Sequence, residues 1–191
     1  MKLLEDKILK EGRVIGTDIL KVDCFLNHQI DVALLEEMGM EWKRLFEQEK
    51  ITRVLTIEAS GIALACFAAR AFRVPMVFAK KSHTRNQSDQ VYTSEVYSFT
   101  HETTYQISVD KKYILPGDRV LIVDDFLANG KALNGLVDLI NQAGAEVAGV
   151  GIAVEKSFQG GGDELRKKGI RIESLARVAA MSEENGVEFV K

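Results

Sequence analysis

The chain has few of the residues that build disulfide frameworks and metal sites. Its 191 residues include only two cysteines, Cys24 and Cys66, and their spacing matches no zinc motif. Both stand among apolar residues, so we expect two small buried hydrophobic side chains rather than ligands or a disulfide. Positive charge is not in excess either. With 25 basic and 28 acidic residues the formal net charge is -3, which argues against nonspecific nucleic-acid binding.

The sequence also lacks segments that would divide it or place it in a membrane. No apolar run approaches membrane-spanning length, and the first residues, MKLLEDKILKEG, carry acids within their apolar pattern and no small-residue cleavage site. No repeat, low-complexity tract or linker rich in Pro, Gly or Ser interrupts the chain. We therefore expect a single domain over residues 1–191 in a soluble, cytoplasmic protein.

The order of apolar and polar residues predicts an α/β protein. Expected strands at 53–57, 74–78, 119–123 and 146–154 alternate with helical patterns, which is typical of a parallel sheet covered by helices on both faces. Upstream, a helix at 2–11 is expected to end at Gly12, and Asp31 to cap a long helix. The polar segment 80–110 contains neither proline nor glycine, and its alternating residues predict a β-hairpin flap.

Two adjacent carboxylates follow the apolar run 120–123, which reads as a strand buried on both faces. After Asp124 and Asp125, a short loop with Gly130 leads into a helical pattern. Free N–H groups at a helix start favour a phosphate, and paired acids suit sugar hydroxyls or hydrated Mg²⁺. A P-loop is excluded, because Ala132 follows Lys131 where that motif requires Ser or Thr. Capping of the next turn by the two acids stays open as the alternative.

The segment VLIVDDFLANGKA, residues 120–132, resembles the phosphoribosyl pyrophosphate motif of the type I phosphoribosyltransferases. The resemblance implies that Asp124 and Asp125 hold the ribose hydroxyls and stabilise positive charge at C1 of the ribose. It implies a loop for the 5-phosphate formed by Ala128, Asn129, Gly130, Lys131 and Ala132.

The resemblance also implies the family fold, a central, mostly parallel sheet flanked by helices, with an N-terminal hood and a β-hairpin flap. The hood would cover residues 1–36 and the α/β core 37–179, with the flap at about 80–110. A C-terminal tail would follow at 180–191.

The pyrophosphate would lie at a second loop of the same sheet edge. EASG, residues 58–61, resembles the family's pyrophosphate loop, which implies contacts from Ala59, Ser60 and Gly61. Lys80 and Lys81 suit the leaving group as paired cations. The alternatives are that Ser60 caps the following helix and that the two lysines are solvated. Mg²⁺ would be held mainly by the pyrophosphate, with Asp124 or Asp125 assisting directly or through water.

The base is expected to be read by other parts of the chain. Resemblance extends over its whole length and is closest to bacterial members that use xanthine, through ILKVDCFLNHQID (19–31) and VEKSFQGGG (154–162). It implies that Leu20 and Asn27 of the hood contact the purine. A Lys156 ammonium can donate to a 6-oxo group, and Phe158 can stack on the ring. A turn-forming Asn27, a surface Lys156 and a core Phe158 are the alternatives.

The expected function is therefore purine salvage. A homodimeric enzyme would move the 5-phosphoribosyl group to N9 of xanthine, giving xanthosine 5-monophosphate and pyrophosphate. Enzymes that prefer guanine, hypoxanthine or adenine stay open as alternatives, although Lys156 opposes the 6-amino group of adenine. A transcription regulator that senses phosphoribosyl pyrophosphate would require a DNA-binding module, for which the N-terminal residues offer no basic recognition helix.

Overall fold

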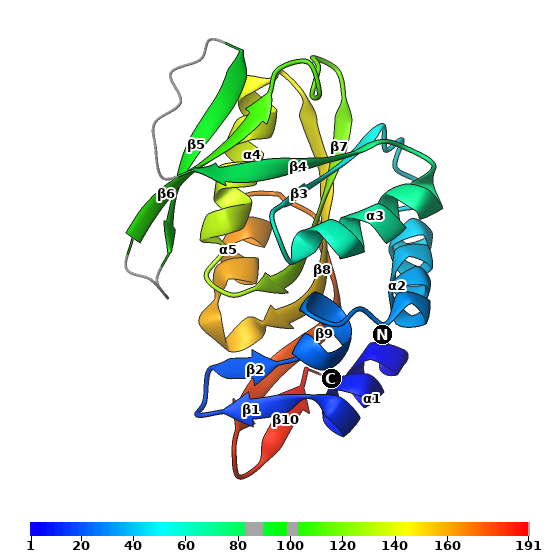
Figure 1. Cartoon of the computed structure of the whole chain (residues 1–191), viewed down its shortest axis with the longest axis vertical. Helices are drawn as coiled ribbons and strands as arrows, with labels where there is room; N and C mark the ends of the chain where they lie inside the picture. Colours follow the sequence, from blue (N-terminus) through cyan, green and yellow to red (C-terminus); the bar gives the residue numbers. More distant parts are fainter. Residues whose placement is uncertain (83–89, 99–102, 191) are drawn as a thin grey trace.

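An eight-stranded sheet runs through the molecule in the computed structural model, which describes residues 1–82, 90–98 and 103–190 (Figure 1). The strand order is β10-β9-β8-β7-β3-β4-β6-β5. Pairing is parallel from β9 to β4 and antiparallel at both edges. The strands are β3 (Arg53–Ile57), β4 (Met76–Ser82), β5 (Val91–Ser98), β6 (Thr103–Asp110), β7 (Arg119–Leu127), β8 (Glu146–Lys156), β9 (Ile172–Ser182) and β10 (Gly186–Phe189).

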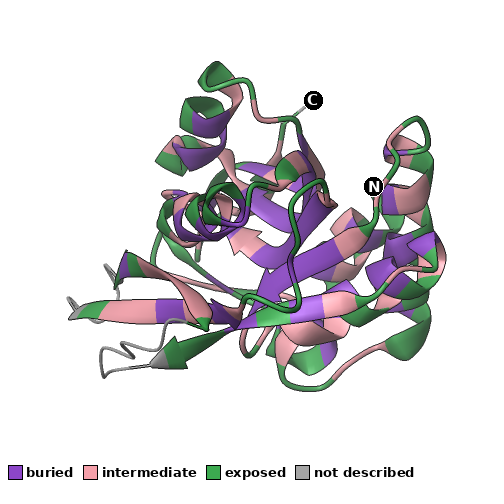
Figure 2. Cartoon of the chain, turned by 90° about the horizontal axis from the view of Figure 1, so that it is seen from above, coloured by how far each residue is buried: buried purple, intermediate pink, exposed green. Residues whose placement is uncertain are grey.

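Helices cover both faces of this sheet, so its central strands are buried (Figure 2). On β7, Leu121 and Val123 belong to the apolar cluster of α2 and α3, whereas Val120 and Ile122 belong to that of α4. This alternation confirms the prediction that the apolar run is buried on both faces. The helices are α1 (Lys2–Glu11), α2 (Val32–Leu45), α3 (Gly61–Phe72), α4 (Lys131–Gln142) and α5 (Gly161–Lys167), with a π-helical turn η1 (Asp23–Asn27) and a 3-10 turn η2 (Ser157–Gln159).

The predicted hood packs against β9 and β10, at one edge of the sheet. It contains α1, η1 and a small hairpin of β1 (Arg13–Ile15) and β2 (Ile19–Lys21). Gly16 in the hairpin turn donates its N–H to a carboxylate oxygen of Glu183 at 2.8 Å. The predicted boundary at residue 36 lies inside α2, and the predicted tail 180–191 includes the end of β9 and all of β10. Hood and last strands therefore form one packed unit at the edge of the sheet.

Among the local predictions, the helix cap and the flap strands are confirmed and the burial of the cysteines is wrong. The Asp31 side chain accepts the Leu34 N–H at 3.1 Å and caps α2 as predicted. The β5–β6 hairpin confirms the ordered strands of the flap, while flap residues 83–89 and 99–102 lie outside the described residues. The prediction of buried cysteines is wrong, because Cys24 and Cys66 are both exposed. In each helix the neighbouring apolar residues, such as Phe25 and Ala65, take the buried positions instead.

Candidate active site

The site lies where the direction of chain winding reverses. From β3 the chain crosses through α3 to β4 on one side, and from β7 it crosses through α4 to β8 on the other. In open α/β sheets such a reversal leaves a crevice at the carboxyl ends of the two strands. β3 pairs with β7 from Arg53 to Leu55, whereas β8 pairs with β7 as far as Leu127. The last residues of β7 therefore line the opening between β7 and β3.

Asp124 and Asp125 stand in this opening. The expectation that they follow the strand is wrong, because β7 continues to Leu127 through its pairing with β8. They are 5% and 8% exposed, and each accepts the N–H of the next residue at 3.0 Å. Burial, and then the charge of Asp125, raise the pKa of Asp124 well above its ordinary value, with Lys81 acting in the opposite direction. Such a pair favours positive charge and hydrogen-bond donors in front of it.

The predicted 5-phosphate loop joins β7 to α4. Lys131 and Ala132 are already the first residues of α4, and Gly130 has a positive φ of 76°, which glycine adopts without strain. The Lys131 N–H donates to the Asn129 side-chain oxygen at 3.2 Å. Behind the loop, the Gly161 N–H donates to the Ala128 carbonyl at 3.1 Å. The loop before α4 is thus held from α5, and the start of a helix is a position that favours an anion.

The predicted pyrophosphate loop approaches the acids from β3. Ala59 and Ser60 precede Gly61, the first residue of α3, and the Glu58–Ala59 peptide bond is cis. A Cβ on Gly61 would lie 2.8 Å from an Asp124 carboxylate oxygen, so only glycine permits this approach. Within the described chain, the Ser60 side chain forms no capping hydrogen bond. The capping alternative for Ser60 therefore finds no support.

The two lysines of β4 take different positions. The Lys81 ammonium lies 5.3 Å from the ring centroid of Tyr105 and lowers the pKa of Asp124, so it faces the acids. Lys80 lines a groove with Phe78 and Tyr113 on the other side of the strand. Neighbouring residues of a strand point to opposite faces. The structure thus brings one of the two predicted cations to the carboxylates.

The predicted purine contacts gather where the hood meets the sheet. The Asn27 amide donates to an Asp125 carboxylate oxygen at 3.0 Å, and the Lys156 ammonium donates to the Asp18 carbonyl at 2.5 Å. Burial lowers the pKa of Lys156, partly offset by the charge of Asp18. Leu20 is buried, at 6% exposed, whereas Phe158 is 43% exposed. The alternative of a core Phe158 is therefore wrong, whereas Asn27 both ends the turn η1 and bonds to Asp125.

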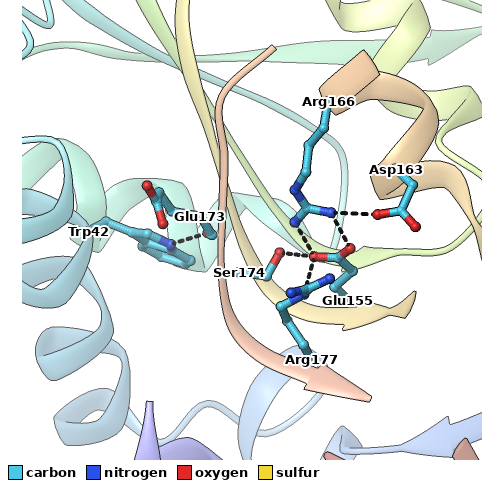
Figure 3. Close-up of polar contacts among 7 residues, drawn as sticks. All are labelled: Trp42, Glu155, Asp163, Arg166, Glu173, Ser174 and Arg177. Carbon is cyan, nitrogen blue, oxygen red and sulfur yellow. Dashed lines mark hydrogen bonds and ion pairs between the residues drawn. The ribbon is translucent and has the colours of Figure 1, made fainter. Parts of the chain in front are cut away.

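Three side chains at the site were missed in the sequence. The Phe126 ring centroid lies 5.4 Å from the Lys156 ammonium. The Thr56 hydroxyl is buried at the end of β3 and finds no hydrogen-bond partner among the described residues. Glu155 is 1% exposed and binds arginine side chains (Figure 3). An acid directly after the apolar run of β8 was a weak signal for Glu155, because carboxylates are rarely buried without a partner.

Across the residues that the structure describes, no group of three or more His, Cys, Asp or Glu side chains is placed to hold a metal ion. The carboxylates of Asp124 and Asp125 do fit a hydrated cation, since positive charge offsets the burial, and then the charge of Asp125, that raise the pKa of Asp124. In the same described parts of the chain, no helix is long and apolar enough to cross a membrane.

Comparison with known proteins gives consistent matches. A model described as phosphoribosyl transferase domain matches residues 29–175. Xanthine phosphoribosyltransferase of Ruminiclostridium cellulolyticum is 57% identical over 97% of each chain. The enzyme of the same name from Lachnoclostridium phytofermentans is 55% identical over 97% of this chain and 96% of its own. Among solved structures, the adenine phosphoribosyltransferase of Giardia lamblia superimposes with a TM-score of 0.76 at 22% identity, covering 91% of this chain and 97% of its own.

Proposed function

The chain belongs to the phosphoribosyl transferase domain family, and on this premise we propose that it transfers the 5-phosphoribosyl group from phosphoribosyl pyrophosphate to N9 of xanthine. The products are xanthosine 5-monophosphate and pyrophosphate. The observation that carries the proposal is the similarity to relatives named xanthine phosphoribosyltransferase, at 51–57% identity over nearly the whole chain. The solved adenine enzymes, at 22% identity, support the fold alone.

The family match and the longer similarity divide the site into two parts. The family model covers residues 29–175 and thus the carboxylates, the 5-phosphate loop and Lys156. Leu20 and Asn27 lie before that range, in the hood, and are covered by the match to a Bacillus cytotoxicus relative over 100% of this chain. Of the residues proposed to contact the base, those of the hood therefore lie outside the family model and Lys156 lies within it.

Sugar transfer is assigned to the crevice between β3 and β7. The bond from C1 of the ribose to pyrophosphate breaks with its electron pair going to pyrophosphate, and N9 forms a bond to C1 and loses its proton. Positive charge develops at C1, and the buried carboxylates of Asp124 and Asp125 are placed to stabilise it. The start of α4 offers N–H groups to the 5-phosphate. Lys81 and the loop before α3 are placed for the departing pyrophosphate.

Magnesium is proposed as the cofactor, on the fit of carboxylate oxygens to a hard cation. When bound, it would neutralise charge on the pyrophosphate, and Asp124 or Asp125 would assist in holding it. The protein groups themselves orient the sugar and exclude water from it.

Choice of base is assigned to Lys156 and Asn27. Lys156 bonds an oxygen acceptor, the Asp18 carbonyl, and a purine 6-oxo group is an acceptor of the same kind. The 6-amino group of adenine is a donor and would oppose it. The Asn27 amide would pair with the 2-oxo group that xanthine has and hypoxanthine lacks. Leu20 and Phe158 would contact the ring, and Phe158, at 43% exposed, has surface open to it.

We propose further that the enzyme works as a homodimer in the cytoplasm. The dimer rests on the family resemblance and on the long flap. The cytoplasm agrees with two free, exposed thiols in the described chain, Cys24 and Cys66, since oxidising compartments favour paired cysteines. Light scattering coupled to gel filtration tests the dimer.

The test of the function is incubation with phosphoribosyl pyrophosphate, Mg²⁺ and one base at a time, with nucleotides separated by chromatography. We expect xanthosine monophosphate as the fastest-formed product among reactions with xanthine, guanine, hypoxanthine and adenine. Absence of any nucleotide product would refute the proposed transferase activity, and a preference for adenine would refute the role proposed for Lys156.

A further inference from the structure

A buried carboxylate that the proposed reaction does not use lies directly behind the site. Glu155 is the second-last residue of β8 and is 1% exposed. Its two oxygens accept a bidentate pair of hydrogen bonds from Arg166 of α5, both at 2.7 Å. The Oε2 oxygen of Glu155 also accepts a hydrogen bond from the Ser174 hydroxyl at 2.5 Å and lies 3.4 Å from the Arg177 guanidinium. Ser174 and Arg177 are both residues of β9 (Figure 3). Glu155 therefore joins β8, β9 and α5 at one point.

Helix α5 in turn supports the proposed 5-phosphate loop. At its start, the Gly161 N–H donates to the Ala128 carbonyl at 3.1 Å. At its end, the Lys168 ammonium donates to the Asn134 side-chain oxygen at 3.0 Å, and the Asn134 amide donates to the Gly130 carbonyl at 2.8 Å. Two separate hydrogen-bonded routes thus connect α5 to both ends of the loop.

The same carboxylate is adjacent in the chain to the proposed base-reading residue. Side chains of successive strand residues point to opposite faces, so Glu155 turns toward α5 while Lys156 turns toward the hood and Asp18. Any shift of this part of β8 relative to α5 moves the Lys156 ammonium relative to the 5-phosphate loop.

Stability alone does not account for a charge at this position. Replacing a buried ion pair by apolar residues of similar volume is often neutral or stabilising. A bidentate guanidinium–carboxylate pair does fix direction as well as distance. The arrangement is thus suited to holding two parts of a site in register.

We propose that Glu155 is a positioning residue, which binds α5 to β8 and so fixes the distance between the 5-phosphate loop and the Lys156 ammonium. The inference rests on the proposed function, because it presumes that these two parts hold the two substrates. Misplacing either would weaken the binding of both, since the nucleotide spans them.

The test compares Glu155→Gln with a matched control, Glu49→Gln. Glu49 also binds a guanidinium, that of Arg119, at 2.6 Å. Arg119 is the first residue of β7, so this pair lies at the opposite end of the sheet from Glu155. We measure the KM for xanthine, the KM for phosphoribosyl pyrophosphate and the dissociation constant of xanthosine monophosphate, at a temperature where each variant is fully folded. Glu155→Gln is expected to raise all three by about tenfold or more, as for a misplacement of about 1 Å. Glu49→Gln should lower the melting temperature and leave all three unchanged.

A second variant keeps the proposal testable if Glu155→Gln does not fold. Arg166→Lys retains the positive charge but loses the bidentate fork, and it is expected to raise the same three constants. Unchanged constants in both variants, or a change in the KM of only one substrate, would overturn the positioning role. A wild-type protein that makes no nucleotide from xanthine would instead overturn the proposed function.

Discussion

Replacing Asp124 by Asn should make the protein more stable and nearly inactive at the same time. The carboxylate is buried beside Asp125, and burial and that neighbouring charge raise the pKa of Asp124 well above its ordinary value of 3.8. The folded protein therefore binds this proton more tightly than the unfolded chain does, and stability falls as pH rises through the interval between the ordinary and the raised pKa. At neutral pH the folded protein is therefore less stable, because of the Asp124 carboxyl, than it is at low pH. An amide of the same shape removes that penalty.

The size of the gain follows from the burial. Leaving a buried polar group poorly satisfied costs about 1–3 kcal/mol, and for a chain of this length 1 kcal/mol moves the melting temperature by roughly 2–4 °C. We expect Asp124→Asn to melt roughly 2–12 °C higher at neutral pH. The gain should disappear as the pH falls toward 3.8, where wild-type Asp124 is protonated.

Thermal denaturation of both proteins without substrates, followed by circular dichroism across this pH range, measures the effect. Asp6→Asn provides the control, because Asp6 is 57% exposed on α1 and its amide should change the melting temperature little. A lower melting temperature of Asp124→Asn at neutral pH, or a gain that does not depend on pH, would refute the reasoning. Turnover of Asp124→Asn should fall by about 100-fold or more, as for loss of an electrostatic group at a reacting centre.

Three further predictions concern the bases and pH. Lys156→Gln should raise the KM for xanthine by about 10- to 100-fold and reduce the preference of the enzyme for xanthine over adenine. Competition assays with both bases measure this preference, and an unchanged value would contradict the role of Lys156. Asn27→Ala should reduce discrimination between xanthine and hypoxanthine, measured as the ratio of kcat/KM values, and an unaltered ratio would contradict its pairing with the 2-oxo group. Because the pKa of Asp124 is raised, kcat/KM should decline on acidification at a higher pH than an ordinary aspartate would give; a decline only near 3.8 would exclude Asp124 as the titrating group.

The sequence predicted the parts of the fold that depend on local patterns. The run at 120–123 is apolar on every residue, so its burial on both faces could be predicted without knowing its neighbours. The cap at Asp31 depends only on the next three residues. β9 was missed because Glu173 and Arg177 interrupt its apolar pattern. Its place in the sheet depends on pairing with β8, which is a tertiary contact.

The sequence predicted which loops share one edge of the sheet, but not how their side chains are arranged. The sequence alone does not distinguish Lys80 from Lys81. In the structure β4 continues through both residues, so their side chains point to opposite faces of the strand. The bond from Asn27 to Asp125 joins residues 98 apart, and that from Lys156 to Asp18 joins residues 138 apart. Contacts at such separations depend on how the hood packs, which no local pattern encodes.

These two long-range bonds involve groups that are proposed to recognise the sugar and the base. Asn27 donates to Asp125 and Lys156 donates to Asp18, so each of these groups has an internal partner. Binding is then an exchange of partners, and its free energy is a difference between two sets of bonds. A ligand gains only the amount by which its own hydrogen bonds to these side chains exceed the internal bonds that it replaces.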